Sequence, residues 1–370
     1  MKVLFLADPS ASHTIKWVNS LSRKGIDISV FGLKEFDRND YSGLNNFKII
    51  TSDFKSNLFL KKDGSIGKTI YLKEYFRLKK IIEDYKPDII HAHYATSYGM
   101  LGALTGFHPY IVSVWGSDVY NFPGRSFLHK SIFKYILSKA DRILSTSRIM
   151  AGKISKYSRK NIDVTPFGID LDKFFPQDVE RLFGKNDIVI GTIKTLEKKY
   201  GVEYLIKAFK ILKDKYPGLP LKLLIAGSGT QTDCLKNLSS QLNILSDTIF
   251  TGFINHKDVP KYQNMIDIFV SLSVEDSESF GVAVLEASAC EKPAVVSNVG
   301  GLPEVVENNV TGYVVEKENP ATTAEAIGKL LLNKSLRVQM GKNGRERVIK
   351  YYNLMDNVNQ MLKIYDEVLN

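Results

Sequence analysis

The sequence contains little cysteine and no long apolar run. Only two of its 370 residues are cysteines, Cys234 and Cys290, and their separation fits neither a metal site nor a redox motif. We therefore expect two ordinary core residues in a reducing cytosol rather than a disulfide framework. No apolar run reaches the roughly 18 residues of a membrane-spanning helix. The apolar start of the chain ends at Asp8 and Pro9, too early for a signal peptide, and is better explained as a buried strand.

Acidic residues are scarce relative to basic ones, but only in the first half. Residues 1–175 hold 27 Lys and Arg against 16 Asp and Glu, whereas residues 176–370 hold 23 against 24. Two interpretations fit the basic half: a solvated surface, or a surface that meets an anionic partner such as phospholipid headgroups. Nucleic acid is not an expected partner, because no nucleic-acid-binding motif accompanies the charge.

Apolar, β-branched runs alternate with amphipathic helical stretches along the chain. Strands are predicted at 2–7, 27–32, 87–92, 109–114 and 141–147, and then at 187–193, 221–227, 247–253, 267–273, 293–298 and 312–316. Such strands, separated by helices, predict parallel sheets covered on both faces. The stretch 165–177, with its Pro and Gly residues, predicts a linker. The fold class is therefore α/β, with two Rossmann-like doubly wound domains facing each other across a crevice, where a ligand is expected.

Two carboxylates eight residues apart carry the strongest chemical signal. Glu278 closes a polar loop, and Glu286 lies within the helix that follows. Phe280, Gly281 and Val282 form the first turn of that helix, whose free N–H groups and positive dipole end favour an anion. Glu286 is placed to accept hydrogen bonds from two vicinal hydroxyls, as on a ribose, and Glu278 to face a sugar beyond the phosphates. The alternative is an ordinary helix start with acidic residues favoured by the dipole.

A lysine-rich loop follows the strand predicted at 187–193. Lys194 and Lys199 are candidates to neutralise a departing diphosphate, since they lie at the carboxyl end of a strand and near a helix start; the alternative is a solvated loop. After the next strand, the turn Gly227-Ser228-Gly229 lacks the third glycine of a dinucleotide fingerprint. This weakens a dehydrogenase interpretation.

Taken together, these elements resemble the retaining glycosyltransferase family 4, which has the two-domain architecture called GT-B. The resemblance covers most of the chain, and residues 187–316 are similar to the donor half of the family. The matching elements are Glu278 with Glu286, Lys194 with Lys199, the linker Pro166-Phe167-Gly168-Ile169-Asp170 with Phe174 and Pro176, the stretch Gly300-Gly301-Leu302-Pro303-Glu304-Val305-Val306, and the turn Thr311-Gly312-Tyr313.

This resemblance implies a retaining transfer of a sugar from a nucleotide-diphosphate sugar, UDP-linked rather than GDP-linked. The acceptor would be a saccharide or a lipid-linked saccharide, in the synthesis of bacterial surface polysaccharides or glycans. Neither a cofactor nor a metal is expected. A nucleotide-sugar epimerase of the same architecture is the rival enzyme, and a sugar-nucleotide-binding scaffold is the non-enzymatic alternative.

The family also implies roles for individual residues. Glu286 would hold the ribose, and Lys194 and Lys199 the diphosphate. Glu278 and the backbone of 280–282 would contact the sugar and the distal phosphate. The remaining nucleotide contacts would come from the glycine turns and their neighbours, namely Gly227, Gly252, Phe253 and Ile254.

In places the sequence departs from the family pattern. The loop after the first strand lacks the family's Gly-Gly turn, so Ser12 and His13 are the candidates for its phosphate contacts. Trp115 stands where many relatives have a histidine that touches the donor sugar. Lys194 replaces the commoner arginine and loses its bidentate fork. Tyr200 is one extra residue in the lysine loop.

For the first half, which is expected to bind the acceptor, alternatives stay open at each candidate. His93 is either a satisfied structural histidine or a site residue. Asp118 either accepts a hydrogen bond from an acceptor hydroxyl or caps a turn. The basic amphipathic helix predicted at 127–139 either packs on its own sheet or contacts a membrane in part.

These expectations divide the chain into three segments. They are an acceptor-binding domain at 1–175, a donor-binding domain at 176–350, and a C-terminal helix at 351–370 that returns to the first domain. We expect a cytoplasmic protein, bound peripherally to the inner face of the cell membrane if the membrane interpretation of the basic half holds.

Overall fold

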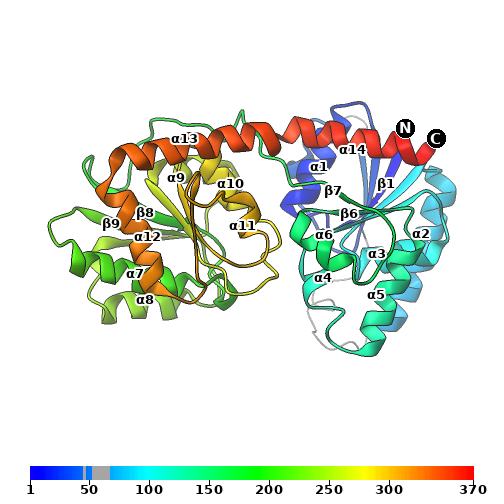
Figure 1. Cartoon of the computed structure of the whole chain (residues 1–370). Helices are drawn as coiled ribbons and strands as arrows, with labels where there is room; N and C mark the ends of the chain where they lie inside the picture. Colours follow the sequence, from blue (N-terminus) through cyan, green and yellow to red (C-terminus); the bar gives the residue numbers. More distant parts are fainter. Residues whose placement is uncertain (45–46, 52–66) are drawn as a thin grey trace. The chain divides into compact units, whose positions relative to one another are not determined.

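The computed structural model describes residues 1–44, 47–51 and 67–370, which form two compact units. One unit comprises Met1–Phe167 with Met355–Asn370, and the other comprises Gly168–Leu354. The division falls between Phe167 and Gly168, inside the stretch predicted as a linker and a few residues before the predicted boundary at 175. The C-terminal segment that packs with the first unit begins at Met355 rather than at 351 (Figure 1).

The first unit is built on a seven-stranded parallel sheet with the order β3-β2-β1-β4-β5-β6-β7. The strands are β1 (Lys2–Leu6), β2 (Asp27–Gly32), β3 (Phe47–Thr51), β4 (Ile89–His93), β5 (Tyr110–Val114), β6 (Arg142–Ser145) and β7 (Ile162–Val164). The helices are α1 (Ser12–Ser22), η1 (Arg38–Tyr41), α2 (Gly67–Tyr85), α3 (Tyr98–Thr105), α4 (Ser117–Tyr120), α5 (Phe127–Lys139), α6 (Arg148–Ile154) and α14 (Leu354–Leu369). The five predicted strands are all present, and the two edge strands β3 and β7 were not predicted.

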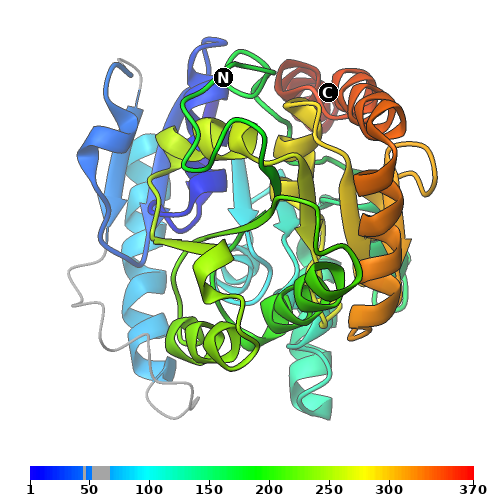
Figure 2. The same ribbon diagram turned by 90° about the vertical axis from the view of Figure 1, so that its left-hand side faces the viewer.

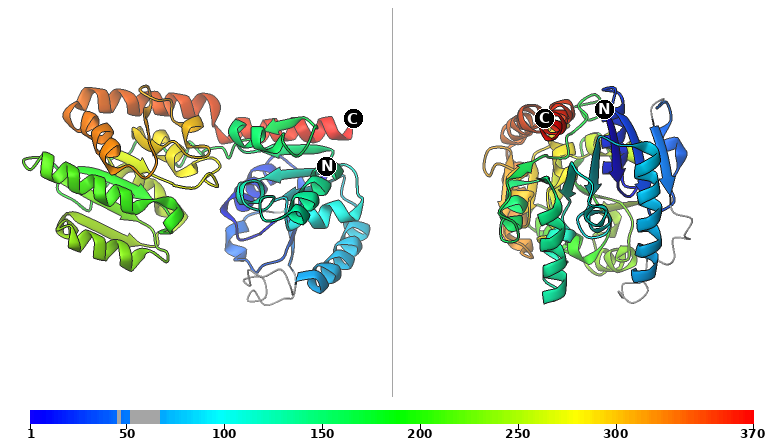
Figure 3. Two further views of the ribbon diagram at one scale, coloured as in Figure 1. Left: turned by 60° about the horizontal axis from the view of Figure 1, so that its bottom comes forward. Right: turned by 90° about the vertical axis from the view of Figure 1, so that its right-hand side faces the viewer.

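Burial in this sheet follows from helices on both of its faces. Every residue of β4 and β5 is buried, as expected of central strands covered on two sides. On one face, α2, α3 and α5 contribute to a core cluster that includes Leu78, Leu101 and Phe133. On the other face lies α14, drawn in red in Figure 3. The Oη of Tyr365 on α14 lies 2.7 Å from Nδ1 of His91 on β4, so α14 covers this face of the sheet.

The second unit is built on a six-stranded parallel sheet with the order β10-β9-β8-β11-β12-β13. The strands, all of them predicted, are β8 (Ile188–Ile193), β9 (Leu221–Ala226), β10 (Thr248–Gly252), β11 (Ile268–Ser271), β12 (Ala294–Ser297) and β13 (Gly312–Val315). The helices are η3 (Lys198–Tyr200), α7 (Val202–Lys215), α8 (Thr232–Gln241), η4 (Leu245–Asp247), η5 (His256–Asp258), α9 (Val259–Met265), α10 (Val282–Ala289), α11 (Leu302–Val305), α12 (Pro320–Leu332) and α13 (Lys334–Tyr351).

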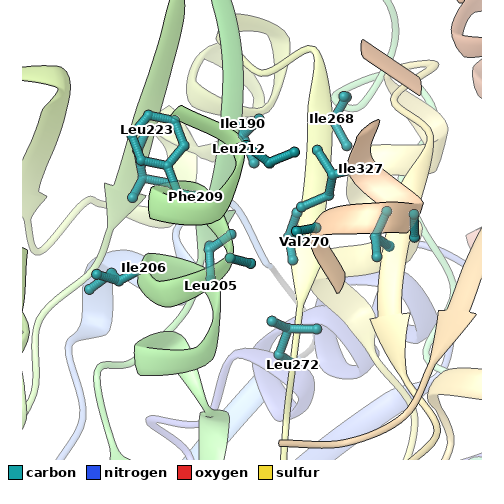
Figure 4. Close-up of a cluster of buried hydrophobic side chains, with 14 of the residues drawn as sticks. Ile190, Leu205, Ile206, Phe209, Leu212, Leu223, Ile268, Val270, Leu272 and Ile327 are labelled. Atoms are coloured by element: carbon teal, nitrogen blue, oxygen red, sulfur yellow. The ribbon is translucent and has the colours of Figure 1, made fainter. Parts of the chain in front are cut away.

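One hydrophobic cluster joins this second sheet to α7 and α12. Phe209 and Leu212 of α7 pack with Leu223 of β9, and Ile327 of α12 packs with Val270 of β11 (Figure 4). The helices α7 and α8, coloured green, lie side by side, and α12, coloured orange, packs against α7 (Figure 2). This cluster holds β8, β9 and β11 in place, and the loops after these strands carry the candidate site.

Two further sequence expectations concern cysteine and membrane spans. Cys290 is buried as predicted, but Cys234 on α8 is exposed, so the expectation of two core cysteines is half wrong. Within residues 1–44, 47–51 and 67–370, no helix combines the length and apolarity needed to cross a bilayer.

Candidate functional site

Loops that follow neighbouring strands meet at the carboxyl edge of the second sheet. Since β8 lies between β9 and β11, the residues after these three strands share that edge. The amide of Lys194 donates to the carbonyl of Ala226 at 2.9 Å, and a methyl group on Gly227 would collide with the carbonyl oxygen of Lys194. The lysine loop and the glycine turn that the sequence singled out are therefore packed against each other.

Lys194 and Glu278 form an ion pair at this edge. The Nζ of Lys194 lies 2.6 Å from Oε2 of Glu278, and the two side chains are only 21% and 10% exposed. Ser273 Oγ donates to the same carboxylate oxygen at 3.3 Å. Burial pushes the pKa of Lys194 down, but the charge of Glu278 and smaller contributions push it up, and the net pKa is raised. The lysine therefore stays positively charged at neutral pH.

Both candidate lysines also lie close to one aromatic ring. The Nζ atoms of Lys194 and Lys199 are 4.2 Å and 4.9 Å from the centroid of the Tyr200 ring. These distances are within the range of cation–π attraction. The sequence marked Tyr200 only as an extra residue, although an aromatic next to basic residues is the signal that identifies such a contact.

Helix α10 begins at Val282 with Gly281 as its N-cap, so Phe280 and Gly281 precede the helix instead of forming its first turn as predicted. Gly281 has a φ of 94°, a left-handed conformation that glycine adopts without a steric penalty. The preceding loop rests on the Gly300-Gly301 turn, where the amide of Gly301 donates to the carbonyl of Glu278 at 2.8 Å. Phe280 is buried, with its ring centroid 5.7 Å from that of Tyr352. Phe280 can therefore offer a ligand its backbone but not its side chain, and Val282 opens the helix.

Glu286 lies on α10 beside the segment predicted to meet the base. Glu286 is buried, and its Oε1 is 3.8 Å from Nε2 of His256, the first residue of η5. Just before η5 come Gly252, Phe253 and Ile254, and the side chain of Phe253 is 75% exposed. The carbonyl of Gly252 accepts a hydrogen bond from the amide of Gly227 at 2.9 Å. The sequence did not point to His256, since no motif spacing connects it to Glu286.

In the first unit, β4 ends in two buried histidines with different surroundings. His91 is satisfied, because its ring nitrogens lie 2.7 Å from Tyr365 Oη and 2.8 Å from Ser113 Oγ. His93 is also buried, but neither of its ring nitrogens has a hydrogen-bond partner among the residues that the structure describes. Burial lowers the pKa of His93 to about 3. This neutral, unsatisfied ring keeps His93 a site candidate and separates it from the structural His91.

His13, His93 and Trp115 lie in one aromatic cluster. The ring of His13 stacks on Phe167 with centroids 3.7 Å apart. The ring of Trp115 is 5.7 Å from that of His13 and 5.1 Å from that of His93. Ser12, the first residue of α1, directly precedes His13. The structure thus brings together residues that the sequence singled out separately, at the carboxyl ends of β1, β4 and β5.

Asp118 is engaged by the backbone of the turn that carries it and of a neighbouring loop. Its carboxylate is fully buried and accepts the amides of Ala95 at 2.8 Å, Gly116 at 2.8 Å and Trp115 at 3.2 Å. Burial raises its pKa, these hydrogen bonds oppose the rise, and the net pKa is raised. These contacts favour the turn-capping alternative for Asp118, because three backbone amides already engage its carboxylate, and its contact with an acceptor hydroxyl stays a prediction.

Helix α5 is packed at one end and open at the other. Its buried side chains, Phe133, Ile136 and Leu137, belong to the core of the first unit. At its N-terminal end Phe127 is 86% exposed and Leu128 is 64% exposed. Lys130 and Lys134 are exposed on the same helix, drawn in teal in Figure 3. We call these four residues, Phe127, Leu128, Lys130 and Lys134, the α5 patch.

Comparisons with known proteins indicate the family to which the chain is related. The family description "Glycosyl transferases group 1" matches residues 175–347, and "Glycosyl transferase 4-like" matches residues 2–147. The capsular polysaccharide biosynthesis glycosyltransferase CapM of Staphylococcus aureus is 30% identical over 75% of this chain and 76% of its own length. A GDP-mannose-dependent α-(1-6)-phosphatidylinositol monomannoside mannosyltransferase of Mycolicibacterium smegmatis is 27% identical over 73% of this chain and 74% of its own.

Solved structures share the fold. Sucrose-phosphate synthase from Thermosynechococcus elongatus superposes with a TM-score of 0.84 at 20% identity, covering 99% of this chain and 98% of that one. Anabaena HepE in complex with UDP superposes with a TM-score of 0.80 at 17% identity, covering 99% and 100%. The fold is thus GT-B, with two Rossmann-like units, and the chain belongs to the group 1, GT4-type family of glycosyltransferases.

Proposed function

We propose that this glycosyltransferase moves a sugar from a UDP-sugar to a saccharide or lipid-linked acceptor with retention of the anomeric configuration. The observation that carries the proposal is the partly buried pair of Lys194 and Glu278, with Lys199 nearby, at the sheet edge where α10 begins. Family membership supports a transferase over the rival epimerase. The names of the two curated relatives support a role in polysaccharide or glycolipid synthesis.

Each donor contact has a candidate residue in the second unit. Lys194, Lys199 and the N-terminal turn of α10 offer positive charge to the diphosphate, and Glu286 offers a carboxylate to the ribose hydroxyls. The exposed ring of Phe253 offers the base a stacking surface. A dinucleotide cofactor is not required for this chemistry.

The proposed step breaks the bond between the anomeric carbon and the β-phosphate oxygen. The oxygen of an acceptor hydroxyl forms the new bond on the same face of the sugar, and its proton passes to the departing phosphate. Negative charge grows on the diphosphate as the bond breaks. Cations fixed before the reaction stabilise that charge without reorganising, which is the effect that electrostatic catalysis needs.

We propose that no metal takes part, although the chain contains one Asp-x-Asp spacing, Asp170-Leu171-Asp172. Asp170 lies 3.1 Å from Nζ of Lys173 and also accepts the amide of Asp172 at 3.2 Å. These contacts engage Asp170 within its own turn. In the part of the chain that the structure describes, no group of three or more His, Cys, Asp or Glu side chains is placed to hold a metal ion.

For the acceptor we propose the first unit, with His93 as the candidate, while Ser12 and His13 remain the candidates for phosphate contacts from the loop after the first strand. The unsatisfied ring of His93 and the neighbouring face of Trp115 are suited to sugar hydroxyls and to a sugar ring, respectively. We further propose that the α5 patch brings this unit to an anionic membrane surface, where a lipid-linked acceptor resides.

A nucleotide-sugar screen tests the donor proposal. UDP-, GDP- and ADP-linked sugars are compared by thermal shift, since a ligand that binds the native state raises the melting temperature. The expected result is the largest rise with a UDP-sugar. The selected donor is then incubated with and without acceptor extract, and the anomeric configuration of the product is read by NMR. A rise only with GDP-sugars contradicts the UDP assignment, and an inverted product contradicts retention.

A further inference from the structure

Among the residues that the structure describes, Tyr200 is the aromatic side chain whose ring contacts both candidate cations of the donor site. Its ring centroid lies 4.2 Å from Nζ of Lys194 and 4.9 Å from Nζ of Lys199. The two lysines come from different local structures, since Lys194 directly follows β8 and Lys199 lies in η3. The Tyr200 ring therefore lies beside both Lys194, which pairs with Glu278, and Lys199, which does not.

Backbone contacts hold the turn that carries Tyr200 in place. Its amide donates to the carbonyl of Glu197 at 2.9 Å, and the amide of Val274, after β11, donates to the carbonyl of Lys199 at 2.9 Å. Gly201 follows with a φ of 61°, and a methyl group there would collide with the carbonyl oxygen of Leu272. The turn that carries Tyr200 is thus pressed against the end of β11, which fixes the backbone from which the ring projects toward the two lysines.

Two lysines at one anion site repel each other before the anion arrives. Glu278 relieves this repulsion at Lys194, but a second carboxylate would cancel the charge that the leaving diphosphate needs. The face of an aromatic ring attracts a cation while leaving its charge intact. A neutral ring is therefore suited to holding two ammonium groups close together before the diphosphate binds.

We propose that Tyr200 is a positioning residue that holds Lys194 and Lys199 at the diphosphate through its ring face, independently of its hydroxyl. The proposal rests on the proposed role of these lysines in the donor site. It assigns a function to a residue that the sequence pattern marked only as an extra position.

Three variants and a control test this role. Tyr200→Leu removes the ring, Tyr200→Phe keeps the ring without the hydroxyl, and Tyr200→Trp keeps a larger ring. The control is Tyr351→Leu, because Tyr351 also has two cations near its ring, Arg347 at 5.4 Å and Lys350 at 5.0 Å, but it lies on α13 away from the lysine loop. The assay is release of nucleotide diphosphate from the donor selected by thermal shift, with water in place of the acceptor.

We expect Tyr200→Leu to lower kcat roughly 10-fold at saturating donor with a smaller change in KM, because the lysines act on charge that grows during bond breaking. Tyr200→Phe should restore most of that loss, and the control should keep the wild-type kcat. Unchanged kcat in Tyr200→Leu overturns the proposal, and so does an equal loss in Tyr200→Leu and Tyr200→Phe, which would assign the effect to the hydroxyl.

Two further measurements distinguish a failed role for Tyr200 from misfolding of the variant and from failure of the proposed donor site. The melting curve shows whether Tyr200→Leu folds. If it does not, Tyr200→Phe and Tyr200→Trp are compared with the wild type instead. A kcat lowered more than 10-fold in both of these variants contradicts a role for the ring face. Lys194→Ala and Lys199→Ala are assayed alongside. Loss of turnover in the lysine variants without loss in Tyr200→Leu refutes only the role of Tyr200, whereas unchanged lysine variants refute the donor site itself.

Discussion

The Nζ atom of Lys194 and the Oε2 atom of Glu278 lie 2.6 Å apart, which joins the loop after β8 to the loop before α10. This contact explains how a largely buried lysine stays charged. Burial favours the neutral amine, and the carboxylate reverses that preference, so the pKa of Lys194 is raised. The same contact places the carboxylate that is proposed to face the sugar beside a cation that is proposed to face the diphosphate.

Glu286→Ala is predicted to weaken nucleotide binding while the fold is retained. Two ribose hydroxyls lose a charged acceptor, and a hydrogen bond to a charged group contributes about 1.5–3 kcal/mol, so the Kd for UDP should rise roughly 10- to 150-fold. Isothermal titration calorimetry with UDP measures the change. Glu325→Ala on the exposed side of α12 is the matched control. An unchanged Kd in folded Glu286→Ala contradicts the ribose role.

Activity is predicted to persist in EDTA. Lys194, Lys199 and the start of α10 already supply the positive charge that a divalent cation would otherwise bring. Nucleotide release from the selected donor is compared in EDTA and in magnesium or manganese. Activity that disappears in EDTA and returns with either metal would show that a metal ion takes part, held by Asp170 and Asp172 or by another set of ligands.

The sequence predicted most of the scaffold, because long buried strands and amphipathic helices have strong periodic patterns. It missed β3 and β7, which are short edge strands with intermediate burial and therefore lack a continuous apolar run. It identified Lys194 and Glu278 but not their contact, since pairing between distant loops depends on tertiary packing. The role of Asp118 was undecidable for the same reason: one of its donors, Ala95, lies in another loop.

Vesicle binding through the α5 patch is predicted to need anionic lipid and to weaken with salt. Lysines near an anionic leaflet contribute about 1 kcal/mol each, and exposed charges are screened over about 8 Å at physiological ionic strength. Co-sedimentation with phosphatidylcholine vesicles, with and without phosphatidylglycerol, measures the binding.

The double variant Phe127→Ser/Leu128→Ser should lose most of this binding. Leu332→Ser on α12 is the control, because Leu332 is 65% exposed but belongs to the less basic half of the chain. Equal binding to both vesicle types, or wild-type binding by the double variant, would leave the α5 patch without a membrane role.

His93 is predicted to make the fold sensitive to mild acid. The pKa of His93 is about 3 in the folded chain, against about 6.5 in the unfolded chain. The unfolded state therefore binds a proton first, and stability that is present above pH 6.5 is lost as pH falls toward 3, at about 1.4 kcal/mol per pH unit.

Urea unfolding at pH 7 and pH 5 measures this effect. The wild type should lose about 2 kcal/mol more over this interval than His93→Leu does. His129→Gln on α5 is the control for removal of a less buried histidine. The same pH dependence in the wild type and in His93→Leu would contradict a buried, neutral His93.

The turnover of Lys194→Ala and Lys199→Ala at saturating donor tests the central claim most directly. Each lysine is proposed to meet charge that grows on the departing diphosphate, so its loss should lower kcat far more than it lowers the melting temperature. Lys207→Ala on α7, where Lys207 pairs with Glu203 at 2.9 Å, controls for the loss of a half-exposed lysine. We predict a kcat reduced at least 10-fold in both site variants and unchanged in the control. Near-wild-type kcat in both folded site variants would contradict the proposed donor site.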